Sequence, residues 1–211
     1  MSPRRAAALR GGDQSLRDHL IAAARRLIAA RGTGGLTVRD IAREAGVADG
    51  VLYNHFADKE ELLAYALHAH VGSAAAGGGP LPEAGTATVE ANLRTHLTRA
   101  LALHAAILPA LTGLLHQPRV LARFAELAPS TADGSSVRST LVDYLRAEQQ
   151  LGRVAPDARV DAVAALVVGV CHDLVLSRLL DPAGQLPPEF SEQAVDDLAD
   201  TLLRGIAPTA G

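Results

Sequence analysis

Apolar residues recur every three or four positions along most of the chain, and this spacing predicts helices rather than strands. In the first third, the pattern predicts helices at about 15–31, 37–46, 47–56 and 58–71. A stretch rich in Gly, Ala and Pro at 72–88 follows and predicts a loop. Residues 1–13 show no clear period, so we expect a flexible, weakly basic arm before the first helix.

The same spacing continues through the last two-thirds of the chain. Predicted helices there cover about 86–106, 136–151, 157–180 and 191–206, with short helices broken by Pro109 and Pro118 after the first of them. Loops are expected at 128–135 and 182–188. The apolar residues are mainly Ala, Leu and Val, and aromatic residues make up only 3%, which favours packed helices. We therefore predict an all-α protein of about nine or ten helices.

Residues 37–56 have the local signals of two short helices joined by a tight turn. Thr37 followed by Asp40 is a capping box at the start of the first helix. Gly46 is the residue type that ends a helix in a left-handed turn, and a second helix is expected to run to about Phe56. Such a pair forms a helix-turn-helix unit, whose second helix enters the DNA major groove. An ordinary helical hairpin has the same signals, so the flanking segments decide.

Charge divides the chain into two parts. Residues 1–60 hold ten Lys plus Arg against seven Asp plus Glu, which gives +3. Residues 61–211 hold ten against sixteen, which gives −6, and the two parts make up the net charge of −3. Phosphate contacts need local positive charge rather than a basic whole protein. The basic first part therefore agrees with DNA binding by the helix-turn-helix candidate.

Consecutive N-terminal segments carry a family resemblance. After the first predicted helix come Gly-Leu-Thr-Val-Arg-Asp-Ile-Ala-Arg-Glu-Ala-Gly-Val at 35–47, Leu-Tyr-Asn-His-Phe at 52–56 and Asp-Lys-Glu-Glu-Leu-Leu at 58–63. Their order, spacing and residue types closely resemble the TetR family of bacterial transcriptional regulators. The resemblance implies a three-helix helix-turn-helix domain at 14–74, with its motif at 37–56. It also implies a helical ligand-binding and dimerisation domain at 75–211.

The candidate DNA contacts combine hydrogen-bond donors with small side chains. Matching family positions imply phosphate contacts from Tyr53 and His55, whose hydroxyl and imidazole N–H can donate. Lys59 adds an ammonium to the free amides at the start of the next helix, and the fork of Arg39 can bind guanine in two places. The full predicted set is Thr37, Arg39, Ala48, Asp49, Gly50, Val51, Tyr53, Asn54, His55 and Lys59.

Two residues of this set depart from the common family pattern. Ala48 stands where a Ser often caps the recognition helix, and Asp49 where a basic or neutral residue is frequent. Asp49 either accepts from a cytosine amine or stabilises the helix N-terminus while weakening non-specific binding. Two alternatives stay open, that Tyr53 is merely packing and that Arg39 and Arg43 are only solvated surface charges.

Polar side chains on otherwise apolar helices are the candidate ligand contacts of the second domain. His104 is the best of them because it continues the stripe of Leu97, Leu101 and Leu108. For each residue alone, a hydrogen-bonded core or surface position is the more common role. No His-x-x-x-His or Cys-x-x-Cys spacing occurs, so we expect neither a metal nor a cofactor. The predicted set is His104, His116, Phe124, Tyr144, Cys171 and His172.

The predicted helix at 157–180 has two apolar faces, and such a helix must cover both. One face repeats at the spacing of a helix-packing seam: Val160, Val163, Val167, Val170 and Leu174. The other consists of small residues: Ala162, Ala165 and Gly169. We predict a homodimer in which the helices at 136–151 and 157–180 pair with their copies, as the resemblance also implies. The alternative is a central helix buried in a monomer.

These features predict a cytoplasmic, DNA-binding transcriptional regulator. The resemblance implies a repressor that a small-molecule ligand releases from a palindromic operator, with an architectural DNA-binding protein or a helical enzyme as alternatives. Two observations argue against an enzyme. The adjacent residues Cys171, His172 and Asp173 would point about 100° apart on a helix, so they cannot form a catalytic triad with one another. No Walker or dinucleotide-binding motif occurs in the sequence. The single Cys agrees with a reducing compartment. No membrane segment is expected, because the longest apolar run, 162–171, is too short.

Overall fold

The structure is a computed structural model that describes residues 3–77, 79–127, 135–181 and 191–204. Within these ranges every element is helical, with eight α-helices and one 3-10 helix, which confirms the predicted all-α class. The chain forms two compact units, and each is assembled from two separate segments. Unit 1 comprises Met1–Ala75 and Pro109–Ala132, and unit 2 comprises Ala76–Leu108 and Asp133–Gly211.

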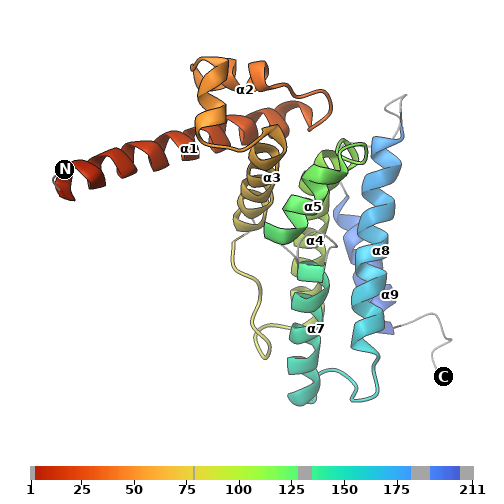
Figure 1. Ribbon diagram of the computed structural model, residues 1–211. Helices are drawn as coiled ribbons and strands as arrows, with labels where there is room; N and C mark the ends of the chain where they lie inside the picture. Colours follow the sequence, from red (N-terminus) through yellow and green to blue (C-terminus); the bar gives the residue numbers. More distant parts are fainter. Residues whose placement is uncertain (1–2, 78, 128–134, 182–190, 205–211) are drawn as a thin grey trace, which may run out of the picture. The chain divides into compact units, whose positions relative to one another are not determined.

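Unit 1 begins with four helical elements in the predicted order (Figure 1). They are α1 (Pro3–Arg31), α2 (Val38–Ala45), the 3-10 helix η1 (Asp49–Asn54) and α3 (Lys59–Ala76). The side chains that they bury are almost all apolar, which is what the period of three and four predicts. They include Leu20, Ile28, Ile41, Leu52, Leu62, Leu63 and Leu67, and Leu36 and Phe56 from the connecting turns are buried with them.

Two of these helices are longer than predicted. α1 begins at Pro3 and not near residue 15, so the expectation of a flexible arm is wrong for residues 3–13. Ala, Leu and Arg are strong helix formers, and proline is tolerated at a first helical position. α3 continues through Gly72 to Ala76 instead of ending before it, because one glycine costs a helix only about 1 kcal/mol.

The second segment of unit 1 starts inside α4 (Val89–Thr112). The predicted break at Pro109 is wrong, since α4 continues for three residues beyond it. A proline removes one amide donor from the helix, and here only the last residues of the helix follow it. α5 (Pro118–Leu127) then begins on a proline, as proline's preference for the first helical position predicts, and buries Val120 and Phe124.

Unit 2 is built on α7 (Ser135–Gln150) and α8 (Val160–Leu179), which pack side by side (Figure 1). Most of α4 and α9 (Glu192–Arg204) join the same apolar core. α8 begins three residues later than predicted. The loop predicted at 182–188 lies outside the described residues. So does the loop predicted at 128–135, except for its last residue, Ser135, which begins α7. The core of unit 2 includes Leu93, Leu97, Leu101, Leu141, Leu145, Val160, Ala164, Val167 and Val195.

The two apolar faces of α8 have different neighbours. Of the predicted seam, Val160 and Val167 are buried inside unit 2, and Val163 and Leu174 pack partly buried against its core. Val170, the remaining member, lies on the outward side of the helix instead. The face of small residues points outward, and Leu166 beside it is 60% exposed. Of the described helices, only α8 has the length and mean hydropathy (1.8) of a membrane span. Core helices have the same composition, so this property decides nothing by itself.

Candidate nucleic-acid interface

The helix-turn-helix motif is held by the capping interactions that its sequence predicts. The hydroxyl of Thr37 accepts from the amide of Asp40 at 3.1 Å, and the carboxylate of Asp40 accepts from the amide of Thr37 at 3.0 Å. Hydrogen bonds from Thr37, and then the nearby Arg31, lower the pKa of Asp40 to about 2. At the other end of α2, Gly46 adopts a left-handed φ of 69°, which a residue without Cβ reaches at no steric cost. Both ends of α2 are therefore fixed.

The recognition segment η1 is a short 3-10 helix and not the longer helix predicted to reach Phe56. Its N-cap residue is Ala48, which has no side-chain oxygen to cap the amides that follow. Gly50 adds backbone freedom one residue later. The missing cap noted in the sequence therefore coincides with a tighter, shorter helix at this position.

The side chains of η1 divide into an anchoring side and an outward side. Leu52 is buried in unit 1, as is Phe56 just beyond the helix. Tyr53 is 60% exposed, which counts against the alternative that it is merely a packing residue. Asn54 is exposed and His55 is half-buried. The buried Leu52 and Phe56 thus leave Tyr53 and Asn54 facing solvent.

Arg39 and Asp49 meet across the turn of the motif. Nε of Arg39 lies 3.4 Å from a carboxylate oxygen of Asp49. Both side chains are largely exposed, at 84% and 54%, and exposed pairs of this kind are weak. Arg39 can therefore leave Asp49 at little cost and donate to another acceptor.

A second side-chain cap fixes the N-terminus of α3. Oδ1 of Asp58 accepts from the amide of Glu61 at 2.8 Å, and Glu61 accepts from the amide of Ala57 at 2.7 Å. Lys59 follows directly in the first turn. The start of α3 lies next to η1 and α2, and a narrow crevice runs between them. The crevice is lined by Val38, Leu52, Tyr53, Phe56, Asp58, Lys59 and Leu62.

Two arginines distant in sequence complete this region, and sequence analysis missed both. The guanidinium of Arg17 on α1 lies 4.7 Å from the ring centroid of Phe56 and 4.2 Å from that of Tyr65. Arg123 on α5 donates to both carboxylate oxygens of Asp58, at 2.9 Å to Oδ2. No local motif could reveal these contacts, because the partners are tens of residues apart.

The ligand candidates of unit 2 form two separate groups. His104 and His172 meet edge to face with ring centroids 5.0 Å apart, and Nδ1 of His104 donates to the carbonyl of Ala100 at 2.6 Å. Burial lowers the pKa of His104. Burial also raises the pKa of the Cys171 thiol to about 12. Tyr144 belongs to the other group.

Tyr144 lies in a polar cluster that the sequence did not indicate. Its ring stacks on His96 at 4.5 Å between centroids, and Glu148, one turn further along α7, is fully buried. Burial, and next Glu148, raise the pKa of Tyr144 to about 12, while burial lowers that of His96 to about 4. Glu148 accepts from the amide of Gly85 at 3.3 Å. These contacts hold the loop before α4 against α7.

The other two ligand candidates belong to unit 1, where Phe124 is buried and His116 is exposed. The structure thus does not gather the six candidates within one unit. Among the described residues, no group of three or more His, Cys, Asp or Glu side chains could hold a metal ion.

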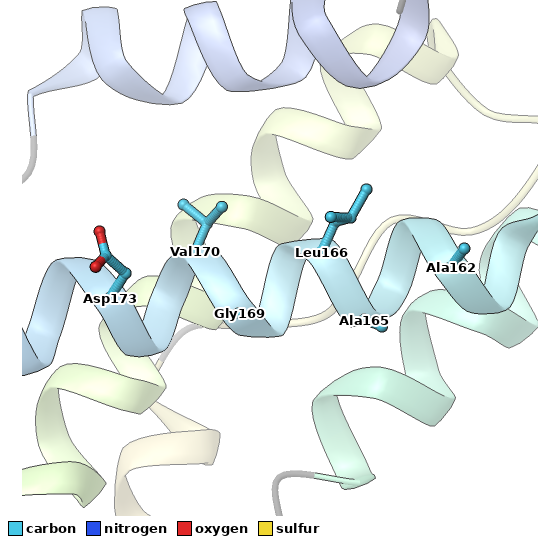
Figure 2. Close-up of a pocket in the computed structure, with 6 residues that line it drawn as sticks. All are labelled: Ala162, Ala165, Leu166, Gly169, Val170 and Asp173. Carbon is cyan, nitrogen blue, oxygen red and sulfur yellow. The ribbon is translucent and has the colours of Figure 1, made fainter.

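The outward face of α8 forms a shallow, apolar groove (Figure 2). In Figure 2 the side chains of Leu166, Val170 and Asp173 extend from the same side of the helix. Gly169 leaves its backbone open, because no atom lies within 4 Å of where a Cβ would stand. The groove is lined by Ala162, Ala165, Leu166, Gly169, Val170 and Asp173.

Sequence comparisons match the helix-turn-helix region of unit 1. Residues 20–66 match the family described as bacterial regulatory proteins, tetR family. The HTH-type transcriptional repressor KstR2 of Mycobacterium tuberculosis is 47% identical over 53 residues, which are 25% of this chain and 26% of that protein. KstR2 of Mycolicibacterium smegmatis is 47% identical over 49 residues, 23% and 24% of the two chains. The match thus spans about a quarter of these relatives.

Solved structures resemble the chain over most of its length. The transcriptional regulator FadR from Bacillus subtilis, in complex with stearoyl-CoA, superposes with a TM-score of 0.61 at 20% identity, covering 90% of this chain and 98% of that one. A putative transcriptional regulator from Saccharomonospora viridis, in complex with choline, gives 0.66 at 20% identity, covering 91% and 97%. At this identity the likeness shows the fold.

Proposed function

We propose that this chain, a TetR-family transcriptional regulator by its DNA-binding domain, represses transcription from a palindromic operator and is released by a small molecule. The observation that carries the proposal is the capped helix-turn-helix of unit 1. It exposes Tyr53 and Arg39 to solvent, while Leu52 and Phe56 are buried in the apolar core. Repression is inferred from the curated relatives, which are repressors. The cytoplasm is the compartment where such a regulator meets DNA.

In this proposal η1 enters the major groove and the residues around it contact phosphates. Tyr53, His55, Lys59 and the hydroxyl of Thr37 supply donors to the backbone, and Arg39 supplies a base or groove-edge contact once it leaves Asp49. Ala48, Gly50 and Val51 offer only small apolar contacts, with Asn54 as the polar exception. This set predicts that phosphate contacts provide most of the affinity, which should therefore fall steeply with salt.

We propose that the homodimer forms through the outward face of α8. Two α8 helices can approach closely there because Ala162, Ala165 and Gly169 are small, and Leu166 would lose its exposure. The outward side of α7 carries charged residues such as Arg138, Asp143 and Arg146. The predicted contribution of the helix at 136–151 to the interface is therefore revised, since its apolar side packs on α8 within the protomer.

We propose that the effector binds in unit 2, next to the paired rings of His104 and His172. The surrounding core is apolar, so the ligand would combine an apolar body with a polar group that reaches the histidines. Two structural neighbours of similar fold hold stearoyl-CoA and choline, and these compounds are the first to try. Binding would favour a dimer whose recognition segments no longer match the half-site spacing.

Gel-shift analysis with the DNA upstream of the chain's own gene tests the proposal. A shifted complex should form, and a compound that releases it should also raise the melting temperature of the protein, because a ligand that binds the folded state stabilises it. Acyl-CoA esters and choline would be tested against this complex. DNA binding that responds to no compound in a broad screen would favour the architectural alternative, and absence of any sequence preference would refute operator binding.

A further inference from the structure

The N-terminus of α3 poses an electrostatic problem for the phosphate contact proposed at Lys59. A helix N-terminus and an ammonium attract a phosphate. However, Lys59 is flanked by Asp58, Glu60 and Glu61, and three carboxylates around one ammonium would repel the same phosphate. Either these carboxylates are neutralised by other groups or the contact is weak.

Arginines from two other helices of unit 1 meet this acidic turn. Arg17 of α1 lies 3.4 Å from Glu61. Arg123 of α5 donates to both oxygens of Asp58, which is the fork geometry that makes arginine–carboxylate pairs strong and well oriented. The amide of Glu61, followed by Arg123 with Arg119 further away, lowers the pKa of Asp58. The carboxylate that caps α3 is therefore charged and also paired.

We propose that Arg123 is an electrostatic positioning residue for operator binding, which neutralises Asp58 so that the start of α3 attracts phosphate. The inference rests on the proposed phosphate contact at Lys59. Asp58 must keep a side-chain oxygen on the amide of Glu61 to cap α3. Arg123 allows this while cancelling the charge of Asp58 beside Lys59, although Arg123 itself does not contact the DNA.

α5 carries no part of the helix-turn-helix, and it joins unit 1 in the segment that follows α4. A displacement of α5 that withdrew Arg123 would expose the charge of Asp58 and weaken the phosphate contact without unfolding any helix. Arg123 thus makes the affinity for DNA depend on the position of α5.

Operator affinity of Arg123→Met, Asp58→Asn and the double variant, measured by fluorescence anisotropy, tests the proposal. Asn caps a helix as well as Asp does, so Asp58→Asn removes the charge and keeps the cap. We expect Arg123→Met to weaken binding at low salt by about threefold per half-site, the effect of one unit charge at roughly 6 Å in water. Asp58→Asn should bind at least as tightly as the wild type, and the double variant should recover wild-type affinity.

Other outcomes overturn the inference. If Arg123 acts only as a structural tie, Asp58→Asn breaks the same pair and should be as weak as Arg123→Met. If the double variant stays as weak as Arg123→Met, charge neutralisation is refuted. The deficit of Arg123→Met should also shrink between about 50 and 200 mM salt, because salt screens charges, and a constant deficit contradicts the proposal.

Two further variants separate this inference from the proposed function. Arg146→Met removes a surface ion pair of 3.0 Å with Asp161 in unit 2 and should leave operator affinity unchanged. Lys59→Ala should weaken binding and lower the salt slope by about one phosphate contact per half-site. An unchanged salt slope for Lys59→Ala would refute the phosphate contact itself. A lowered slope for Lys59→Ala together with wild-type operator affinity of Arg123→Met would refute only the role of Arg123.

Discussion

Gly113 lies where two segments of unit 1 approach too closely for any side chain. It follows α4, and a Cβ added to it would stand 2.5 Å from Oγ1 of Thr33 and 3.1 Å from the amide nitrogen of Gly34. Thr33 is almost fully buried and donates to the carbonyl of Ala110 at 2.6 Å. Gly113→Ala must therefore push apart the turn after α4 and the loop after α1.

The expected cost follows from what has to move. Neither the backbone at Gly34 nor the hydrogen-bonded Thr33 can shift freely, so overpacking should lower the free energy of unfolding by about 1–3 kcal/mol. Urea unfolding followed by circular dichroism measures this difference. Gly72→Ala is the matched control, because Gly72 lies inside α3 with no atom within 4 Å of an added Cβ. It should raise stability by up to about 1 kcal/mol.

A double variant tests whether the clash with Thr33 is the cause. Thr33→Ala alone should cost roughly 1–3 kcal/mol by leaving the buried carbonyl of Ala110 without its donor. Combined with Gly113→Ala, it should cost less than the sum, since the atom nearest to the new Cβ has gone, with a coupling of at least about 0.5 kcal/mol. A stability of Gly113→Ala equal to that of the wild type, or additive effects, would refute the reasoning.

Three other predictions follow from burial and charge. Leu166→Arg should give folded monomers in sedimentation analysis, because Leu166 is exposed on the outward face of α8. Val167→Ala should instead lower the free energy of unfolding by about 2 kcal/mol through lost core packing. A stable Leu166→Arg dimer contradicts the proposed interface. The folded-state pKa of Asp40, about 2, lies below the ordinary aspartate value of 3.8, so its stabilising effect is present above pH 3.8 and is lost as the pH falls towards 2. Thr37→Ala should reduce that loss in acid titrations. The buried Cys171 thiol, with its pKa raised to about 12, should react with a thiol reagent at pH 8 only after denaturant is added, and rapid labelling of the native protein would place the thiol at the surface.

The capping interactions were predictable because each involves residues three or four apart. Thr37 and Asp40 form the reciprocal hydrogen bonds that their spacing indicates, and Gly46 takes the expected left-handed turn. The side chain of Asp58 caps the amide of Glu61 in a similarly local way. Local chemistry of this kind does not depend on the remainder of the fold. The helix-turn-helix and its family resemblance rest on these short-range signals.

Contacts between distant segments could not be predicted in the same way. Arg17 and Arg123 reach Phe56 and Asp58 across 39 and 65 residues of sequence. Neither arginine belongs to a motif, and both resemble ordinary surface charges when only the sequence is considered. The polar cluster around Glu148 was missed for the same reason, since its partners come from α4, α7 and the loop before α4.

The sequence by itself determined the helical class, the apolar side of each helix and the DNA-binding motif, because all three depend on residues within one or two helical turns. Only the tertiary structure decided which apolar face of α8 enters the core, since Val167 and Leu166 are equally hydrophobic in the sequence but differ from 0% to 60% in exposure. It also decided that α5 supplies Arg123 to the cap of α3. A face can be buried, or a charge paired, only by what the fold places against it, and periodicity contains no information about that neighbour.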